Sequence, residues 1–212
     1  MAKSTTKGQC YLCGSAYTKT GMRVHLLKEH DSKAEEQLCY LIRVEGKYSP
    51  DHWIYLDMPV TASLSSLDTF LRKIWLECCG HMSMFYLSGY QEIGQTAKLS
   101  RFLPGDKINY DYDMGSTTTL VITIVGEITR PKQRNAVRLL ARNEPIAYSC
   151  ARCGADAQFI ITETYPNELL CEKCADEAGE TFMLPVTNSP RMGECGYCGE
   201  FDKYAFVPPK KK

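Results

Sequence analysis

Hydrophobic and polar positions follow two different periods in the middle of the chain. Residues 38–45 and 52–60 are rich in β-branched and aromatic side chains and flank the turn-prone residues 46–50, which indicates two strands. Residues 63–79 instead place apolar side chains three and four positions apart, as one face of a helix requires. That face contains Leu64, Leu67, Leu71, Ile74, Trp75 and Cys78. Further strand-like segments follow at 82–88, 107–112 and 117–127.

This order predicts an α+β fold, with a central β-β-α-β-β-β sheet and one main helix across a face, flanked by two small zinc modules. Gly80 is expected to cap the helix. In the last turn, we expect Gly115 to have a positive φ and Asp113 or Ser116 to cap the exposed amides. The expected units are a zinc finger at 1–32, an α+β core domain at 38–128, a basic connector at 129–145, and a zinc ribbon with a C-terminal extension at 146–200.

The first candidate metal site lies near the N-terminus. Cys10-x-x-Cys13 is followed after eleven residues by His25 and after four more by His30. Two thiolates on a turn and two imidazoles about one helical turn apart can complete a tetrahedron around zinc. The pattern resembles a two-Cys-two-His zinc finger over residues 8–30. The positions expected to face DNA bases are Thr18, Gly21 and Val24, and none supplies an Arg, Asn or Gln contact, so base-specific DNA binding is not expected.

The second candidate site is a pair of Cys-x-x-Cys motifs. Cys150 and Cys153 are separated by seventeen residues from Cys171 and Cys174, a spacing typical of four-Cys zinc ribbons. Four thiolates leave no open position for chemistry, so a structural zinc ion is expected here. The two sites together predict two zinc ions.

Five other cysteines have no clear partner. Cys195-x-x-Cys198 is flanked by glycines, which favours a non-catalytic turn, with exchange into the zinc ribbon as a second option and a redox dithiol as a third. Cys39, Cys78 and Cys79 lie in apolar stretches and are interpreted as buried small hydrophobes.

Composition narrows the class of protein. Eight of the eleven cysteines fall in Cys-x-x-Cys pairs, and no apolar segment near the N-terminus suggests export, so we expect a reduced, cytoplasmic protein. No apolar run is long enough to predict a membrane span. The formal net charge is zero, but residues 129–143 carry five basic side chains, whereas residues 144–181 sum to −6. A nucleic-acid surface would therefore lie in the basic segment.

Two segments, residues 69–90 and 108–124, resemble the Ri-plasmid open-reading-frame-three-like family of prokaryotic proteins. Members carry a Leu-rich helix with Trp, a His-Leu-x-x-Phe strand and a Tyr-Asp-Phe-Gly-Asp/Ser turn. The matching positions are Trp75, His81, Phe85 and the turn 112–116, in which Met114 replaces the usual Phe. The resemblance covers residues 38–128 and implies a compact α+β fold, with no established activity to transfer.

The leading hypothesis is a zinc-binding, non-enzymatic adaptor or interaction protein whose partner is expected to be a protein. One alternative is a weak, nonspecific nucleic-acid-binding protein using the segment 130–142. Its basic residues are Arg130, Lys132, Arg134, Arg138 and Arg142. The other alternative is a hydrolase-like enzyme centred on His81 and Asp113. No nucleophile elbow or phosphate-binding glycine loop supports an enzyme. Turn and cap roles for these side chains are favoured instead.

Overall fold

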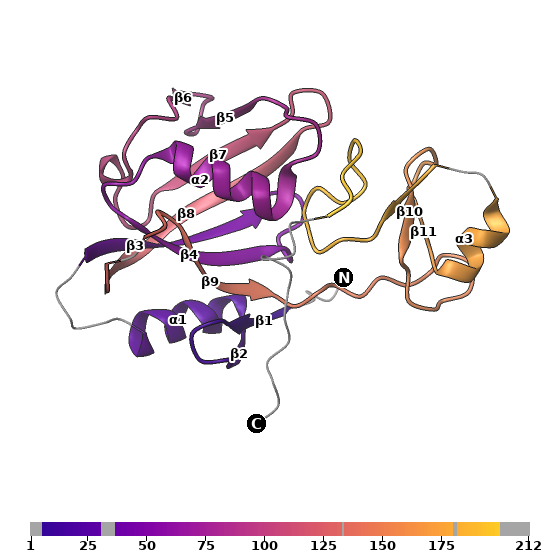
Figure 1. The fold of residues 1–212 in the computed structure, drawn as a ribbon, viewed down its shortest axis with the longest axis horizontal. Coiled ribbons are helices and arrows are strands. Elements are labelled where there is room, and N and C mark those ends of the chain that lie inside the picture. Colours follow the sequence, from indigo (N-terminus) through magenta and orange to yellow (C-terminus); the bar gives the residue numbers. More distant parts are fainter. Residues whose placement is uncertain (1–5, 31–36, 133, 180–181, 200–212) are drawn as a thin grey trace.

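The computed structural model describes residues 6–30, 37–132, 134–179 and 182–199, and Figure 1 shows their arrangement. The strands of the large sheet are β1 (Lys7–Cys10), β2 (Ala16–Thr18), β3 (Gln37–Gly46), β4 (Trp53–Pro59), β5 (Ser83–Tyr86), β6 (Glu92–Ile93), β7 (Lys107–Tyr112), β8 (Thr118–Arg130) and β9 (Arg138–Asn143). A small sheet contains β10 (Phe159–Ile161), β11 (Glu168–Leu170) and β12 (Met183–Pro185). The helical segments are α1 (Lys19–Glu29), α2 (Leu64–Leu71), the π-helical turn η1 (Arg72–Leu76), the 3-10 turn η2 (Leu99–Arg101) and α3 (Glu172–Ala178).

The mixed fold of antiparallel sheet and helix is confirmed, but the sheet is larger than predicted. Its order is β2-β1-β9-β4-β3-β8-β7-β5-β6, so β6 and β9 join the expected central strands and the N-terminal hairpin extends the edge. All of its pairings are antiparallel. Within the described residues, no helix has the length and apolarity needed to cross a membrane.

The central strands are apolar on both faces because a helix covers each face. Alternate residues of a strand point to opposite sides of a sheet. In β4, Ile54 and Leu56 belong to the core under α2 and η1, whereas Trp53 and Tyr55 belong to the core under α1. Figure 1 shows α1 and α2 on opposite sides of the sheet. The result is three layers, with the sheet in the middle.

The N-terminal finger is therefore part of the large sheet and not a separate flanking module. Strand β1 pairs with β9 in the register Gly8↔Asn143 and Cys10↔Ala141. Met22 and Leu26 of α1 are fully buried in one cluster with Trp53. A short finger has little core of its own, and docking on the sheet supplies apolar surface that it lacks. The expected boundary between residues 1–32 and 38–128 lies outside the described residues.

The basic connector is also structural. Residues 129–145 contain the end of β8 and all of β9. Arg130 is only 3% exposed, and its Nε donates to Asp57 at 3.1 Å. Arg138 donates to the same carboxylate at 2.6 Å, and Arg142 is fully buried. The contiguous basic face that a nucleic-acid surface would require is not formed by these arginines.

The main helix ends earlier than the periodicity predicts. Its α-helical part spans Leu64–Leu71, η1 continues to Leu76, and the chain then becomes extended at Glu77. Ser189 Oγ donates to the carbonyl of Trp75 at 2.7 Å, which satisfies one acceptor at the helix end. Gly80 has a φ of 74° but lies beyond the helix end, where its amide donates to Glu77 Oε1 at 2.6 Å. Residues 78–81 consequently form a loop.

The small sheet and α3 project from the core as one lobe, as Figure 1 shows. The chain leaves the core after Asn143 and returns at Asn188. The two side chains exchange contacts: Asn143 Nδ2 donates to Asn188 Oδ1 at 2.7 Å, and Asn188 Nδ2 donates to the Asn143 carbonyl at 3.1 Å. The projecting lobe is thus pinned at both of its ends.

Candidate metal centres

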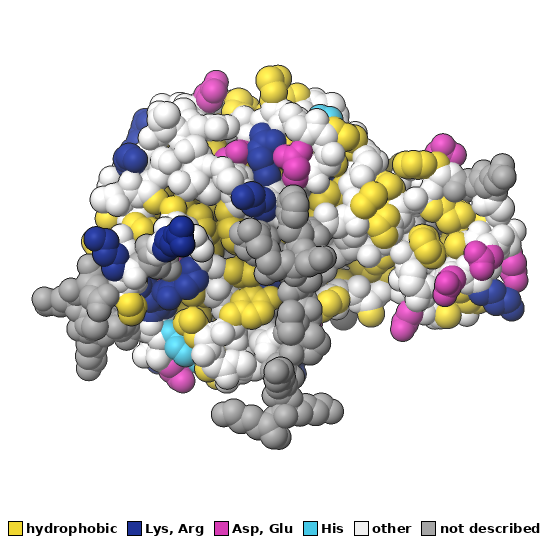
Figure 2. All heavy atoms as spheres, in the orientation of Figure 1, with side chains coloured by type: hydrophobic (Ala, Val, Ile, Leu, Met, Phe, Trp, Pro, Cys, Tyr) yellow, Lys and Arg dark blue, Asp and Glu magenta, His cyan; other side chains and the backbone are white. Residues whose placement is uncertain are grey.

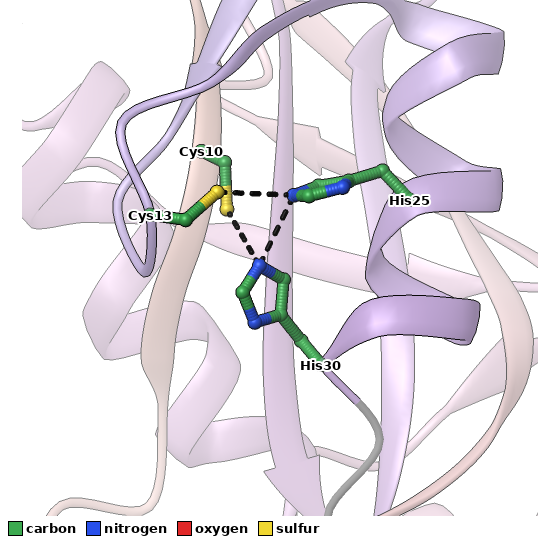
Figure 3. Close-up of side chains that lie close together, drawn as sticks. All are labelled: Cys10, Cys13, His25 and His30. Carbon is green, nitrogen blue, oxygen red and sulfur yellow. Dashed lines mark hydrogen bonds between the residues drawn. The ribbon is translucent and has the colours of Figure 1, made fainter.

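The predicted finger residues meet in space. Cys10 ends β1, Cys13 lies in the turn before β2, His25 lies on α1 and His30 caps it (Figure 3). Cys13 Sγ lies 3.2 Å from His25 Nε2, Cys10 Sγ lies 3.6 Å from His30 Nε2, and the two Nε2 atoms are 3.0 Å apart. All four ligand atoms lie within 4.8 Å of one another.

These distances can be compared with a zinc tetrahedron. Zn–S and Zn–N bonds of about 2.3 and 2.0 Å place two sulfurs about 3.8 Å apart and a sulfur and a nitrogen about 3.5 Å apart. The finger distances lie within a few tenths of an ångström of these values, so the donor set fits a tetrahedral ion.

The surroundings of the finger cluster hold its histidines in place. Thr18 caps α1 by accepting a hydrogen bond from the amide of Gly21 at 3.2 Å. Tyr17 stacks on His25 with ring centroids 4.5 Å apart. Glu29 Oε2 lies 3.7 Å from His25 Nδ1, the nitrogen that does not face the cysteines. Burial and the nearby His25 lower the pKa of His30, which favours the neutral imidazole that metals bind.

The four predicted ribbon cysteines also meet, within the projecting lobe. Their ligand atoms lie within 4.8 Å of one another, and Cys153 Sγ lies 3.5 Å from Cys171 Sγ. A hydrogen bond from the backbone of Cys171 lowers the pKa of Cys150 to about 6, which favours the thiolate. Cys171 directly precedes α3 and Cys174 lies in its first turn, so the start of this helix fixes the relative positions of the second pair of cysteines.

The first pair of each site adopts the same backbone turn. The amide of Gly14 donates to the carbonyl of Cys10 at 2.8 Å, and the amide of Gly154 donates to that of Cys150 at 2.9 Å. Both glycines have a positive φ, 79° and 78°. This conformation suits glycine, and it turns both thiols of a pair toward one point.

A third cluster was not expected from the sequence. Cys78, Cys79 and His81 from the loop after η1 meet Cys195, with all four ligand atoms within 4.8 Å. Cys79 is exposed, so its interpretation as a buried hydrophobe is wrong, whereas Cys78 is partly buried and packs against the core. Cys39 does lie in the core and is fully buried. The spacing Cys78-x-x-His81 matches that of the Cys-x-x-Cys pairs, and this signal could have suggested the site.

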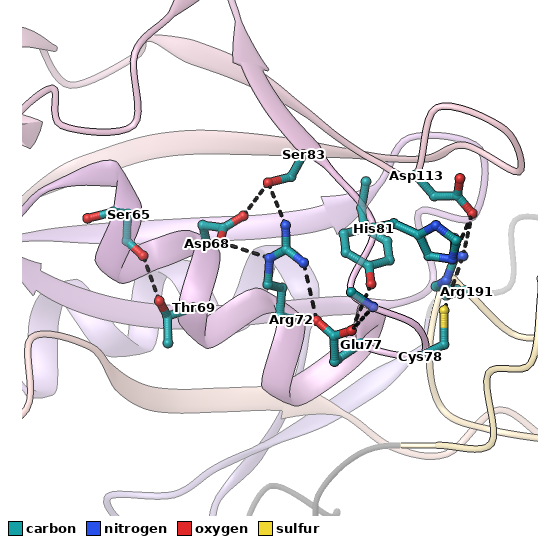
Figure 4. A network of polar contacts seen from close by, with 12 residues as sticks. Ser65, Asp68, Thr69, Arg72, Glu77, Cys78, His81, Ser83, Asp113 and Arg191 are labelled. Atoms are coloured by element: carbon teal, nitrogen blue, oxygen red, sulfur yellow. Dashed lines mark hydrogen bonds and ion pairs between the residues drawn. The ribbon is translucent and has the colours of Figure 1, made fainter.

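The third cluster lies beside a polar network, which Figure 4 shows. His81 Nε2 is 3.5 Å from Cys195 Sγ and 3.5 Å from Asp113 Oδ2. The hydrogen bond with His81 lowers the pKa of Cys195 to about 7. Asp113 also accepts from Arg191 Nη2 at 2.8 Å, and this contact holds the pKa of its carboxyl below the usual range.

Asp113, and not Gly115, has the positive φ in the turn between β7 and β8. Its φ is 66°, and its Oδ1 accepts a hydrogen bond from the amide of Gly115 at 2.9 Å. The expectation for Gly115 is therefore wrong, whereas the expected capping by Asp113 is observed. Aspartate tolerates this conformation because its side chain can bond the backbone two residues on.

A second part of the network holds the loop that carries Cys78, Cys79 and His81. Asp68 of α2 accepts from Arg72 Nε at 2.9 Å and from Tyr110 at 2.7 Å. Arg72 Nη1 in turn donates to Glu77 at 3.2 Å. Burial raises the pKa of Tyr110, which keeps it a hydrogen-bond donor. The start of the loop is thereby tied to α2 and β7.

Comparisons with known proteins give little further information. No protein-family model matches the chain, and no curated protein matches it. Among solved structures, the chain is similar to a protein of unknown function from Methanosarcina mazei Go1, with 14% identity and a TM-score of 0.41. That match covers 50% of this chain and 68% of the other. A similarity of this size assigns neither fold nor function. The fold and site define a protein with Cys/His clusters that could hold metal ions.

Proposed function

We propose that this chain is a zinc-binding, non-enzymatic interaction protein. The observation that carries the proposal is the closed donor set of the two predicted sites, one with two cysteines and two histidines and one with four cysteines. Four protein ligands fill a zinc tetrahedron and leave no open position for a substrate. Zinc in such sites stabilises small folds that could not form by themselves.

The four-Cys lobe is the proposed surface for a partner. It projects from the core, and acidic side chains gather on it beside α3 (Figure 2). Glu172, Asp176 and Glu177 of this helix are all exposed. The ring of Tyr165, in the loop between β10 and β11, is fully exposed. Exposed aromatic rings are common anchors of protein interfaces, whereas an acidic lobe would repel nucleic acid. These features favour a protein partner. Cysteines that serve as zinc ligands must stay reduced, and this favours a cytoplasmic location.

The two alternatives find less support. Arg130 and Arg142 are buried, so the segment 130–142 lacks much of the free charge that phosphate binding needs. The hydrolase hypothesis requires His81 and Asp113 to act on a substrate. His81 Nε2 instead lies equally close to a thiol of the third cluster. Membership of the Ri-plasmid open-reading-frame-three-like family stays a prediction, since no family model matches the chain.

Zinc content tests the metal part of the proposal. Protein purified without added metal should contain zinc, and Cys13→Ser and Cys153→Ser should each lose one ion. Both thiols are exposed, so the substitutions leave the core intact. Cys39→Ala is the control, because Cys39 lies outside the clusters. Protein that contains no zinc, or variants that keep the full content, would overturn the proposal.

Capture from native lysate tests the interaction part. The intact protein should retain a protein partner whether or not the lysate is treated with nuclease. Tyr165→Ala should lose the partner. Tyr48→Ala, which removes an exposed tyrosine outside the projecting lobe, should keep it. Capture that nuclease abolishes would favour the nucleic-acid alternative.

A further inference from the structure

The chain after β12 returns to the core and buries a charged side chain there. Arg191 is fully buried. Its Nη1 donates to the carbonyl of Ser116 at 3.0 Å, and its Nη2 donates to Asp113 at 2.8 Å and to Cys78 Sγ at 3.4 Å. The Cys78 sulfur thus lies within reach of a buried guanidinium, and Arg191 places the returning segment beside the loop after η1. Cys195 follows four residues later, beside this anchor.

The geometry of the third cluster resembles that of the two predicted sites. Cys79 Sγ lies 3.8 Å from Cys195 Sγ, and Cys195 Sγ lies 3.5 Å from His81 Nε2. Both distances agree with the spacing of about 3.8 Å for S···S and 3.5 Å for S···N in a zinc tetrahedron. Cys195 has a φ of 53°, which a residue other than glycine keeps only where its surroundings hold it.

We propose that Cys78, Cys79, His81 and Cys195 bind a third zinc ion. Three thiolates and one imidazole form a soft, tetrahedral donor set that suits zinc and leaves no position open. Arg191 supplies a positive charge beside this set, whose net charge with zinc is negative. The site is independent of the two zinc ions of the proposed function, because it shares no ligand with them.

A disulfide between Cys79 and Cys195 is the competing chemistry. It would use two of the four donors, and it would leave unexplained why Cys78 and His81 lie beside them. Forming it would also require an oxidant to accept two electrons. The zinc site uses all four donors and needs only the loss of thiol protons on binding.

The third ion ties the segment that follows the projecting lobe in the chain to the loop after η1. Cys78, Cys79 and His81 belong to the loop after η1, whereas Cys195 lies 114 residues beyond His81. Zinc binding therefore closes a long loop and adds to the contacts of Asn188 and Arg191. Cys79 and Cys195 are exposed, so a chelator reaches this ion more readily than the ion held partly by the buried Cys150, Cys171 and Cys174.

Native mass spectrometry of the full chain tests the site. The intact protein should carry three zinc ions and Cys195→Ser should carry two. Cys198→Ser is the matched control, because Cys198 belongs to the same exposed motif but lies outside the cluster, and it should carry three. When zinc release to the chromogenic chelator 4-(2-pyridylazo)resorcinol is followed over time, one ion should leave the intact protein before the others. This fast phase of release should be absent from Cys195→Ser and present in Cys198→Ser.

Three results would overturn the third site. The intact protein and Cys195→Ser could both carry two ions, which would leave the two sites of the proposed function standing. A mass two daltons low with two bound ions, restored by reductant, would identify the disulfide. Loss of an ion from Cys198→Ser would show that the ligand set is wrong. A failure of the proposed function gives a different result, because the intact protein would then lack the two ions that depend on Cys13 and Cys153.

Discussion

Asp57 offers a strong test of the structural role of the basic segment. It is fully buried on β4, and its carboxylate accepts from Arg130 Nε at 3.1 Å and Arg138 Nη2 at 2.6 Å. Asp57→Ala would remove the partner of both arginines. Arg130, which is itself 3% exposed, would then hold an uncompensated buried charge.

The expected cost follows from this burial. Removing one partner of a buried ion pair costs about 3–5 kcal/mol, since the remaining charge stays out of water. Arg138 is 31% exposed and can be rehydrated, so we place Asp57→Ala near the lower end, at about 3 kcal/mol. With a urea m-value of roughly 2 kcal/mol per molar, the unfolding midpoint should fall by about 1.5 M.

Urea unfolding, followed by tryptophan fluorescence at saturating zinc, measures this effect. Glu177→Ala is the control, because its pair with Lys173 is exposed and 3.9 Å long, and it should cost less than about 0.5 kcal/mol. Adding Arg130→Met to Asp57→Ala should recover part of the loss, because the stranded charge is removed. If Asp57→Ala shifts the midpoint no more than Glu177→Ala, the buried ion pair does not support the fold as argued.

Three further predictions concern stability. Gly8→Ala should cost about 2 kcal/mol in thermal unfolding, because a Cβ would overlap the buried ring of Trp53; a wild-type melting temperature would contradict this. Burial lowers the pKa of His52 to about 4 in the folded protein, whereas His52 in the unfolded chain keeps its ordinary pKa of 6.5. Between these two values the unfolded chain binds a proton that the folded protein does not. From pH 7 to pH 5, the free energy of unfolding of the wild-type protein should therefore fall by about 2 kcal/mol more than that of His52→Gln. Equal pH dependence of the two proteins would refute this prediction. Gly115→Ala should melt like wild type because its φ is not positive, whereas Asp113→Ala should melt lower; the reverse order would contradict the observed turn.

The sequence predicts the two local metal clusters well because their ligands lie close together along the chain. In each of these sites the first Cys-x-x-Cys turn is closed locally by the glycine that follows it, Gly14 or Gly154. For the third cluster, the local spacing identifies only Cys78 and His81 as a possible pair of ligands. Its fourth ligand, Cys195, comes from a distant segment, which Ser189 and Arg191 hold beside the loop through contacts with Trp75 and Asp113.

Helical periodicity predicts the buried face of a helix more accurately than it predicts the residue at which the helix ends. The apolar stripe of residues 63–79 does pack on the sheet, but the end of η1 depends on partners such as Ser189, far away in sequence. The basic segment 130–142 shows the same limit. Its charge suggests a surface for nucleic acid, yet the decisive partner of Arg130 is Asp57, 73 residues away. Long-range pairing of this kind leaves no local pattern.

X-ray absorption at the zinc edge, on protein purified without added metal, tests the central claim most directly. The two-Cys-two-His and four-Cys sites together average three sulfurs and one nitrogen per ion, and the third cluster has the same ratio. The expected spectrum is thus a four-coordinate shell of about three sulfurs near 2.3 Å and one nitrogen near 2.0 Å, whether two or three sites are filled. A shell dominated by oxygen, or protein that contains iron or no metal, would contradict the assignment of these clusters as closed zinc sites.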